Sequence, residues 1–390
     1  MTTTSRLYDA LNDYVGQCQD LWKDIRHLQT LCWMMVGILQ SQSVNLSHFG
    51  IYIDSPAQFA QSHQRRFRRW LSNRRIDVLS VHHRLITQAL AGWESECLYL
   101  SLDTTMLWNE FCLVWVGVVY RGRCIPVSWK LVTQSSATVR LWTIQRVLRQ
   151  AERTMPDDVK IVLLADRGFA DGKLMKYLKH NLGWNFRIRI KRNFQFCLHG
   201  HWVKVSSVSL QPGEAYFTPL VSIGKTNPFD GVYLAFGHDK PSGEHWVIVS
   251  DEPTHLRTFQ DYRLRFQIEE SFLDWKSNGF DLESSRIREK KALSKLCGVL
   301  ALTTLFVMLQ GTQVVASGNR RQVDPHWKRG MSYFKLGWNW LKLAVTRQWK
   351  IQQYRIFSSD SDPDPIALSK RQRQQNNDRV FAVINRVQLC

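Results

Sequence analysis

Residues 97–132 read CLYLSLDTTMLWNEFCLVWVGVVYRGRCIPVSWKLV. The stretch holds three runs rich in valine, leucine and aromatic residues, 97–105, 111–120 and 124–132, which short polar segments separate. Runs of this composition and length between turn-forming residues are typical of β-strands. We therefore predict three strands that follow one another as an antiparallel meander.

The residues after this meander alternate between helical and strand patterns. Helical periodicity runs over Val139–Arg153 and Lys173–Leu182, and apolar strand patterns run over Val159–Ala165 and Phe186–Ile190. The order βββαβαβ predicts an α/β protein with a mixed sheet and helices on both faces, as in the ribonuclease H-like fold. A fold alone does not predict a function, so the function has to be inferred from the individual residues of the site.

Four regions are expected along the chain. Residues 1–92 have helical patterns, residues 93–193 and 251–315 form the α/β core, residues 194–250 form an inserted antiparallel β subdomain, and residues 316–390 form a basic helical region. Two long helices, at about 256–278 and about 289–309, are expected in the second part of the core. In the last region we predict a flexible segment over 358–377 and a short docking helix over Phe381–Leu389.

The charge of the chain is its most unusual bulk property. Of 390 residues, 44% are hydrophobic, which is enough for a large core, and 52 Lys and Arg stand against 33 Asp and Glu, a formal net charge of +19. A peptide hormone or a collagen-like chain is excluded by length and composition. A large positive charge favours a polyanionic partner, and nucleic acid is the first candidate.

The sequence shows no pattern typical of export or membrane insertion. The first residues lack a secretory signal, and the most apolar run, Leu296–Leu309, is shorter than the roughly 18–20 residues that cross a bilayer. The eight cysteines form no CxxC pair. We therefore expect reduced thiols, a cytoplasmic protein and no membrane partner.

Two aspartates lie where predicted strands end. Asp103 follows the run YLSL, and Asp166 follows the run LLA and precedes RGF. The ends of strands are where sheet proteins commonly place ligands. A single aspartate at such a position is more often a turn former or a helix N-cap, and the pair together is what suggests a site.

A stripe of functional side chains is expected on the helix over about 256–278. Tyr262, Arg265, Glu269 and Lys276 lie at offsets of 0, 3, 7 and 14 residues. At about 100° per residue they fall within a stripe about 60° wide, whereas Glu270 projects about 100° away from Glu269. A solvated helix with a chance alignment of charges is the alternative interpretation.

This segment resembles the Y-(2)-R-(3)-E-(6)-K signature of bacterial insertion-sequence transposases of the IS-four group, with every spacing matched. Those enzymes carry a DDE triad on a ribonuclease H-like core with a β insertion before the glutamate. The resemblance runs from about Cys97 to Leu309 and implies that Asp103, Asp166 and Glu269 are the triad. The separations along the chain are 63 and 103 residues, and the longer one has room for the insertion.

Three carboxylates suit hard divalent cations. Carboxylate oxygens without Cys or His favour Mg²⁺, with Mn²⁺ as a substitute, over Zn²⁺. Two such ions can activate an attacking hydroxyl and stabilise the leaving 3′-oxygen in a phosphoryl transfer. Arg265 and Lys276 would neutralise the phosphates beside the scissile bond, and Tyr262 would donate a hydrogen bond, which are also the roles that the resemblance implies.

Further DNA contacts are expected outside the helix. By the resemblance, Trp246 stacks on a flipped base during hairpin formation, and Arg189 and Lys191 touch transposon-end DNA. The alternatives are a core tryptophan and an ordinary solvated strand face. The arginines of the run RRFRRW are expected to bind DNA on a helix of the N-terminal region, and the alternative is a solvated or acid-paired face; these are Arg65, Arg66, Arg68 and Arg69.

The leading hypothesis is a cut-and-paste DNA transposase. It would bind the terminal inverted repeats, cleave through an expected hairpin intermediate, and join the ends to target DNA. A homodimer is expected because two ends must be joined together, and a bacterial nucleoid-associated location follows from the resemblance. Two alternatives stay open: a catalytically silent DNA-binding repressor or domesticated factor, and a metal-dependent nuclease without strand transfer.

Overall fold

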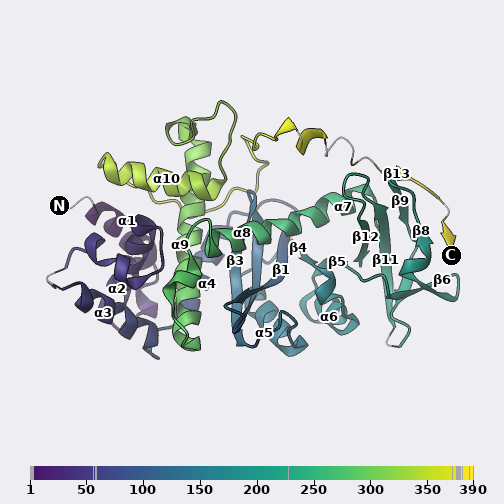
Figure 1. Ribbon diagram of the computed structural model, residues 1–390, viewed down its shortest axis with the longest axis horizontal. Helices are drawn as coiled ribbons and strands as arrows, with labels where there is room; N and C mark the ends of the chain where they lie inside the picture. Colours follow the sequence, from purple (N-terminus) through teal and green to yellow (C-terminus); the bar gives the residue numbers. More distant parts are fainter. Residues whose placement is uncertain are drawn as a thin grey trace.

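The computed structural model describes residues 4–55, 57, 59–226, 228–370, 372–374, 379, 381–385 and 387–389. Figure 1 shows a helical region at one end, a central sheet with its helices, and an extension of the sheet at the other end. The last part of the chain returns along one side of the molecule from the helical end toward the sheet extension.

The N-terminal region is helical, as the sequence patterns predict. Side-chain caps mark where two of its helices begin, because Asp24 accepts a hydrogen bond from the backbone of Arg26 and Asp77 accepts one from that of Ser80. The helices are α1 (Ser5–Gly16), α2 (Ile25–Ser41), α3 (Ala60–Ser72) and α4 (Val78–Leu90). Helices α2, α3 and α4 contact the long helix α9 (Lys290–Ala316), and α1 reaches it through the ring contact of Tyr14 with Phe306 (Figure 1).

The central sheet has the predicted βββαβαβ order. Its strands lie in the order β3-β2-β1-β4-β5, with β1, β2 and β3 antiparallel to one another and β4 parallel to both β1 and β5. This is the topology of the ribonuclease H-like fold. The elements are β1 (Cys97–Leu107), β2 (Phe111–Tyr120), β3 (Arg123–Thr133), α5 (Leu141–Glu152), β4 (Lys160–Ala165), α6 (Gly172–Tyr177, continued by a π turn over Leu178–Leu182) and β5 (Asn185–Arg189).

Neighbouring residues of β3 show which helix covers which face of the sheet. The ring of Trp129 contacts His82 of α4, whereas Lys130, which points to the opposite face, lies 4.3 Å from the ring of Trp142 in α5. Trp115 pairs with Trp129 across the strands and therefore shares its face. Trp115 contacts Trp275 of α8 (Gln267–Lys276), so α4 and α8 lie on one face and α5 on the other.

The inserted strands continue the core sheet. Beyond β5 the order is β12-β11-β10-β6-β7, and β12 pairs directly with β5, with Ile248 opposite Arg189. The segment is antiparallel, as predicted, but its strands extend the core sheet by hydrogen bonding to it. The strands are β6 (Gln195–Leu198), β7 (His201–Lys204), β8 (Val208–Ser209), β9 (Glu214–Phe217), β10 (Val221–Ile223), β11 (Phe229–His238) and β12 (His245–Ser250).

The predicted helix over about 256–278 is interrupted. Helix α7 (Leu256–Arg263) gives way to a 3-10 turn over Leu264–Phe266 before α8 begins. The hydroxyl of Ser101 in β1 donates a hydrogen bond to the carbonyl of Arg265, and side chains that enter the backbone ladder commonly interrupt helices. An uninterrupted helix was therefore the wrong expectation, and the angles worked from 100° per residue do not hold across the break.

Helix α9 (Lys290–Ala316) is longer than predicted. By length and composition it could cross a membrane, but 89% of its most apolar window is buried inside the protein, as in a core helix. It crosses α10 (Tyr333–Thr346) at two glycines, Gly311 and Gly337. A Cβ atom on Gly311 would clash with the carbonyl of Tyr333, so this close crossing needs glycine.

The end of the chain forms strands where a short helix was predicted. β13 (Ala382–Val383) runs parallel to β9, and β14 (Gln388–Leu389) pairs with β8. The ring of Phe381 packs against that of Phe259, 4.8 Å between centroids. The predicted docking helix is therefore wrong, because the open edges of β8 and β9 offer backbone hydrogen bonds that an extended segment can satisfy.

Candidate active site

Strand register brings the two predicted aspartates together. In the parallel pair β1 and β4, Leu102 lies opposite Ala165, so the next residues, Asp103 and Asp166, lie at the same edge of the sheet. Asp103 is opposite Trp115 and therefore points to the face that α8 covers. Asp166 directly follows β4, and its side chain makes no capping hydrogen bond to the turn that comes next.

Arg265 joins the first aspartate to the glutamate. Its Nη1 donates to Asp103 Oδ2 at 3.0 Å and its Nη2 donates to Glu269 Oε1 at 2.7 Å. Only 6% of the Arg265 side chain is exposed, whereas 53% of the Glu269 side chain is. Arg265 lies in the 3-10 turn between α7 and α8, and its guanidinium neutralises part of the negative charge of the two carboxylates.

Burial and like charges perturb the titration of Asp103. Burial raises the pKa of its carboxyl to about 6, the charges of Asp166 and Glu269 add to the rise, and a hydrogen bond from Thr104 and the charge of Arg265 oppose it. That Asp166 and Glu269 both act on Asp103 indicates that the three predicted triad members share one electrostatic site. Perturbed carboxyl groups of this kind are common in catalytic sites.

Of the other two members of the predicted helix stripe, Tyr262 lies beside Arg265 and is acted on by the charge of Asp166, whereas Lys276 is bonded elsewhere. Lys276 Nζ donates to the backbone carbonyl of Met106 at 2.6 Å and lies 4.0 Å from Glu283 Oε1. Tyr262 is fully buried, and burial raises the pKa of its hydroxyl. Glu270 faces away from the site, 57% exposed and 3.8 Å from Arg123 Nη1, as the sequence pattern predicts.

The carboxylates fit a divalent cation in chemistry, although the guanidinium stands between two of them. Among the residues described, no three His, Cys, Asp or Glu side chains lie close enough together to hold one ion. Asp103, Asp166 and Glu269 supply only oxygen donors, which Mg²⁺ and Mn²⁺ prefer. Arg265 would have to release Asp103 or Glu269 before the three carboxylates could converge on metal.

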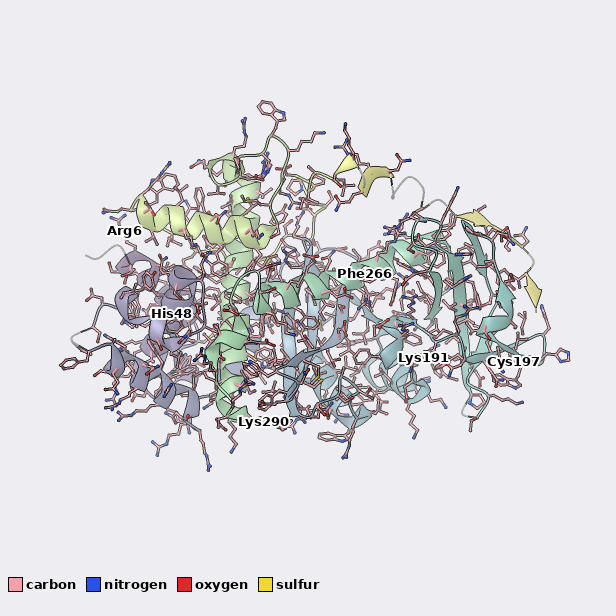
Figure 2. The ribbon with its side chains drawn as sticks, viewed as in Figure 1. Arg6, His48, Lys191, Cys197, Phe266 and Lys290 are labelled. Atoms are coloured by element: carbon pink, nitrogen blue, oxygen red, sulfur yellow. The ribbon has the colours of Figure 1, made fainter. Side chains whose placement is uncertain are left out.

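Trp246 belongs to a small apolar cluster that includes Phe259 and Tyr262 of α7, and Arg189 lies next to it. Trp246 is 6% exposed, its ring centroid lies 5.7 Å from that of Tyr262, and the guanidinium groups of Arg189 and Arg263 lie 5.9 and 5.5 Å from it. Arg189 Nη2 also lies 3.4 Å from Glu244 Oε2. In this arrangement the tryptophan is a core residue, and it would have to be uncovered before a base could stack on it. Lys191 is exposed (Figure 2).

The four arginines of α3 differ in their surroundings. Arg65, Arg68 and Arg69 are exposed. Arg66 is half-buried, and its Nε donates to Thr30 Oγ1 of α2 at 3.0 Å, so it helps to join two helices. The face that α3 presents to solvent therefore includes three of the four arginines.

The fold and the carboxylate edge define the class: a ribonuclease H-like protein with a candidate catalytic site on the α8 face of its sheet. Residues 115–306 match the family described as the transposase DDE domain. This part of the chain is therefore similar to the DDE domain of transposases, a family of polynucleotidyl transferases that typically use divalent metal ions. The match contains Asp166 and Glu269 but begins after Asp103.

The chain is also similar to a solved structure titled as a piggyBac transposase synaptic complex with hairpin DNA. The two are 11% identical, the alignment covers 96% of this chain and 83% of that one, and the TM-score is 0.43, so the likeness is loose. No curated protein gives a significant match to the chain.

One ion-pair network that positions the site was not predicted. Arg187 of β5, 8% exposed, is bonded to Asp261 of α7 and lies 3.6 Å from Glu252 Oε2. The pair fixes α7, and with it the helix break, to the sheet. The alternation of Arg187 and Arg189 on a predicted strand was the available signal, because a charged residue on the buried face of a strand needs an acidic partner.

Proposed function

We propose that this protein is a cut-and-paste transposase that binds terminal inverted repeats, cleaves them with two metal ions and transfers the ends to target DNA. The observation that supports this most is the shared edge where Asp103 and Asp166 lie in register and Arg265 brings Glu269 toward them. Mg²⁺ ions bound there would activate the attacking hydroxyl and stabilise the leaving 3′-oxygen.

The residues of the chain have separate tasks in this scheme. Asp103, Asp166 and Glu269 would bind the ions. Arg265, once it has released a carboxylate, faces the same edge and can pair with the phosphate being cleaved. Lys276 would leave the Met106 carbonyl to contact the neighbouring phosphate. Water first breaks the bond between a phosphorus and its 3′-oxygen, which leaves a free 3′-hydroxyl.

A hairpin is the second step of the proposal. The free 3′-hydroxyl attacks the phosphorus of the opposite strand, which releases the flanking DNA and joins the two strands of the transposon end. Water then opens the hairpin, and the same 3′-hydroxyl attacks target DNA. Trp246 is the residue that we propose to stack on the flipped base, with Tyr262, Arg189 and Lys191 beside it. We propose a homodimer, since two ends must be joined at one target.

The test compares two neighbouring glutamates. A duplex that carries the native terminal repeat and its flank is incubated with Mg²⁺ and with the wild type, Glu269→Gln or Glu270→Gln. We expect Glu269→Gln to abolish nicking and end joining, and Glu270→Gln to retain both, because only Glu269 lies at the carboxylate edge. Equal effects of the two changes would contradict the site, and a wild type that binds ends but never cuts would favour a silent DNA-binding factor.

A second comparison separates a transposase from a simple nuclease. Trp246→Ala removes the stacking side chain, and we expect nicking to continue while hairpin ends are lost. Trp93→Ala, a change at a partly buried tryptophan that packs on the main core, is the control for general loss of stability. Normal hairpin formation by Trp246→Ala would exclude Trp246 from the mechanism, and nicking by the wild type without strand transfer would favour the nuclease.

A further inference from the structure

Helix α5 presents a stripe of basic side chains and one tryptophan to solvent. Trp142, Arg146, Arg149 and Arg153 are all exposed, and the Trp142 ring is 54% exposed. Their spacing of 4, 3 and 4 residues places them within about 60° on the helix surface. These side chains line a groove of about 340 Å³ together with Gln145 and Gln150.

The positive charges of this stripe have no acidic partners. None of the ion pairs within the described part of the chain includes Arg146, Arg149 or Arg153. Glu152 is the only acidic residue of α5, and it lies about 60° outside the stripe. A basic helix face that is not neutralised within the protein is available to an anionic partner.

Two lysines extend the stripe toward a second element. Lys130 Nζ lies 4.3 Å from the centroid of the Trp142 ring, and the pKa of Lys130 is lowered by burial and by the charges of Arg146 and Lys290. Lys290 begins α9, at the lower end of that helix in Figure 2, and α5 lies along the same side of the molecule in Figure 1. Cations from β3, α5 and α9 thus gather at one surface.

The segment that leads into the stripe lies next to the carboxylate edge, and the stripe itself lies on the other face of the sheet. The segment before α5 is hydrogen-bonded to β1, where Thr104 Oγ1 donates to the carbonyl of Ala137 at 3.1 Å, next to Asp103. Lys130 points to the α5 face, whereas Asp103 and Arg265 lie on the α8 face. A duplex on the stripe would therefore reach the carboxylates from the side opposite to the predicted end contacts.

We propose that the α5 stripe, Trp142, Arg146, Arg149 and Arg153 with Lys130, binds the backbone of the target duplex. The inference rests on the proposed function, because only strand transfer brings a second DNA duplex to the catalytic edge. Guanidinium and ammonium groups pair with phosphates without reading sequence, which suits a target that can have any sequence. The stripe is about 16 Å long, enough to follow one backbone for about five base pairs.

The experiment measures capture of a second duplex without catalysis. The full-length protein is saturated with unlabelled terminal-repeat duplex in EDTA, and the binding of a labelled random-sequence duplex is followed by fluorescence anisotropy over a range of salt. The variant is the triple change Arg146→Ala, Arg149→Ala and Arg153→Ala. The control removes the same charge elsewhere, by Arg26→Ala, Arg84→Ala and Arg321→Ala, which are exposed side chains paired with Asp24, Asp20 and the Trp327 ring.

We expect the triple variant to bind the second duplex at least tenfold more weakly, with the slope of log affinity against log salt reduced by about 2.7 for three lost phosphate contacts. In Mg²⁺ it should nick ends like the wild type but join a pre-cut end to plasmid at least tenfold less. Normal capture by the variant would overturn the inference. Equal loss of end binding and nicking would assign the stripe to the transposon end and overturn it as well.

The same experiment separates this inference from the proposed function. A wild type that captures the second duplex through the stripe but never nicks would refute the catalytic scheme and keep a DNA-binding surface on α5. A wild type that nicks and joins ends, with unaltered capture by the triple variant, would keep the transposase and refute the surface.

Discussion

The buried carboxyl of Asp103 has a measurable cost in stability, and Asp103→Asn should reveal it. Burial raises the folded-state pKa of Asp103 to about 6, whereas an unfolded aspartate has a pKa near 3.9. The folded protein therefore binds more protons than the unfolded chain between these values. The contribution of this group to stability is fully present below pH of about 4, and it is lost as the pH rises through about 6.

The size of the effect follows from the difference between the two pKa values. A difference of about 2 units corresponds to about 3 kcal/mol at 1.36 kcal/mol per unit. Because the side chain is only 19% exposed, solvent screening removes little of this. Asn has nearly the shape of the protonated carboxyl but cannot ionise, so Asp103→Asn should stabilise the protein by about 3 kcal/mol at pH 8 and by little at pH 4.

The assay is urea-induced unfolding in EDTA, followed by tryptophan fluorescence, at pH 4 and pH 8 for the wild type, Asp103→Asn and the exposed control Glu270→Gln. Addition of Mg²⁺ at pH 8 should stabilise the wild type more than Asp103→Asn, since a ligand that binds only the folded state raises its stability. A variant that is less stable than the wild type at pH 8 would refute the reasoning, because Arg265 would then stabilise the ionised carboxylate more than burial destabilises it.

Three further predictions concern the fold and the arginines of helix α3. Arg187→Met leaves the buried Asp261 without its partner and should lower the free energy of unfolding by about 3–5 kcal/mol; a loss below about 1 kcal/mol in urea unfolding would show that the pair does not fix α7. Gly311→Ala should lower it by about 1–3 kcal/mol, whereas Gly16→Ala, where a Cβ meets nothing within 4 Å, should not. Arg68→Ala should reduce the salt slope of end binding by about 0.9, and Arg66→Ala, already bonded to α2, by much less; equal slopes would place both on the DNA face.

The central sheet could be predicted because each of its strands carries its own signal. The three β-rich runs, the two helical periods and the two apolar strands recur in the structure within a few residues of the predicted bounds. Asp103 and Asp166 could be placed together because parallel register alone brings two strand ends to one edge. Local pattern was sufficient for these features.

Features that depend on tertiary partners could not be read from the chain. The helix break at Leu264–Phe266 coincides with a hydrogen bond from the hydroxyl of Ser101, which is 164 residues away from Arg265 in sequence. The strand at Ala382–Val383 exists because β9 has an open edge, which no local pattern reveals. The periodicity of the sequence predicted α5 as a helix with one exposed face. It did not show that the positive charges on this face lack acidic partners, because that depends on residues elsewhere in the chain.

The guanidinium between Asp103 and Glu269 also bears on whether folding of the protein requires metal binding. Carboxylates that are close together repel one another in the absence of a metal ion, and many small metal-binding domains fold only when the ion is bound. Here Arg265 supplies a positive charge from within the chain, so folding can finish in the absence of divalent ions. In the function that we propose, metal binding would replace the guanidinium by the ions, and its free energy would be reduced by the ion pairs that must first be broken.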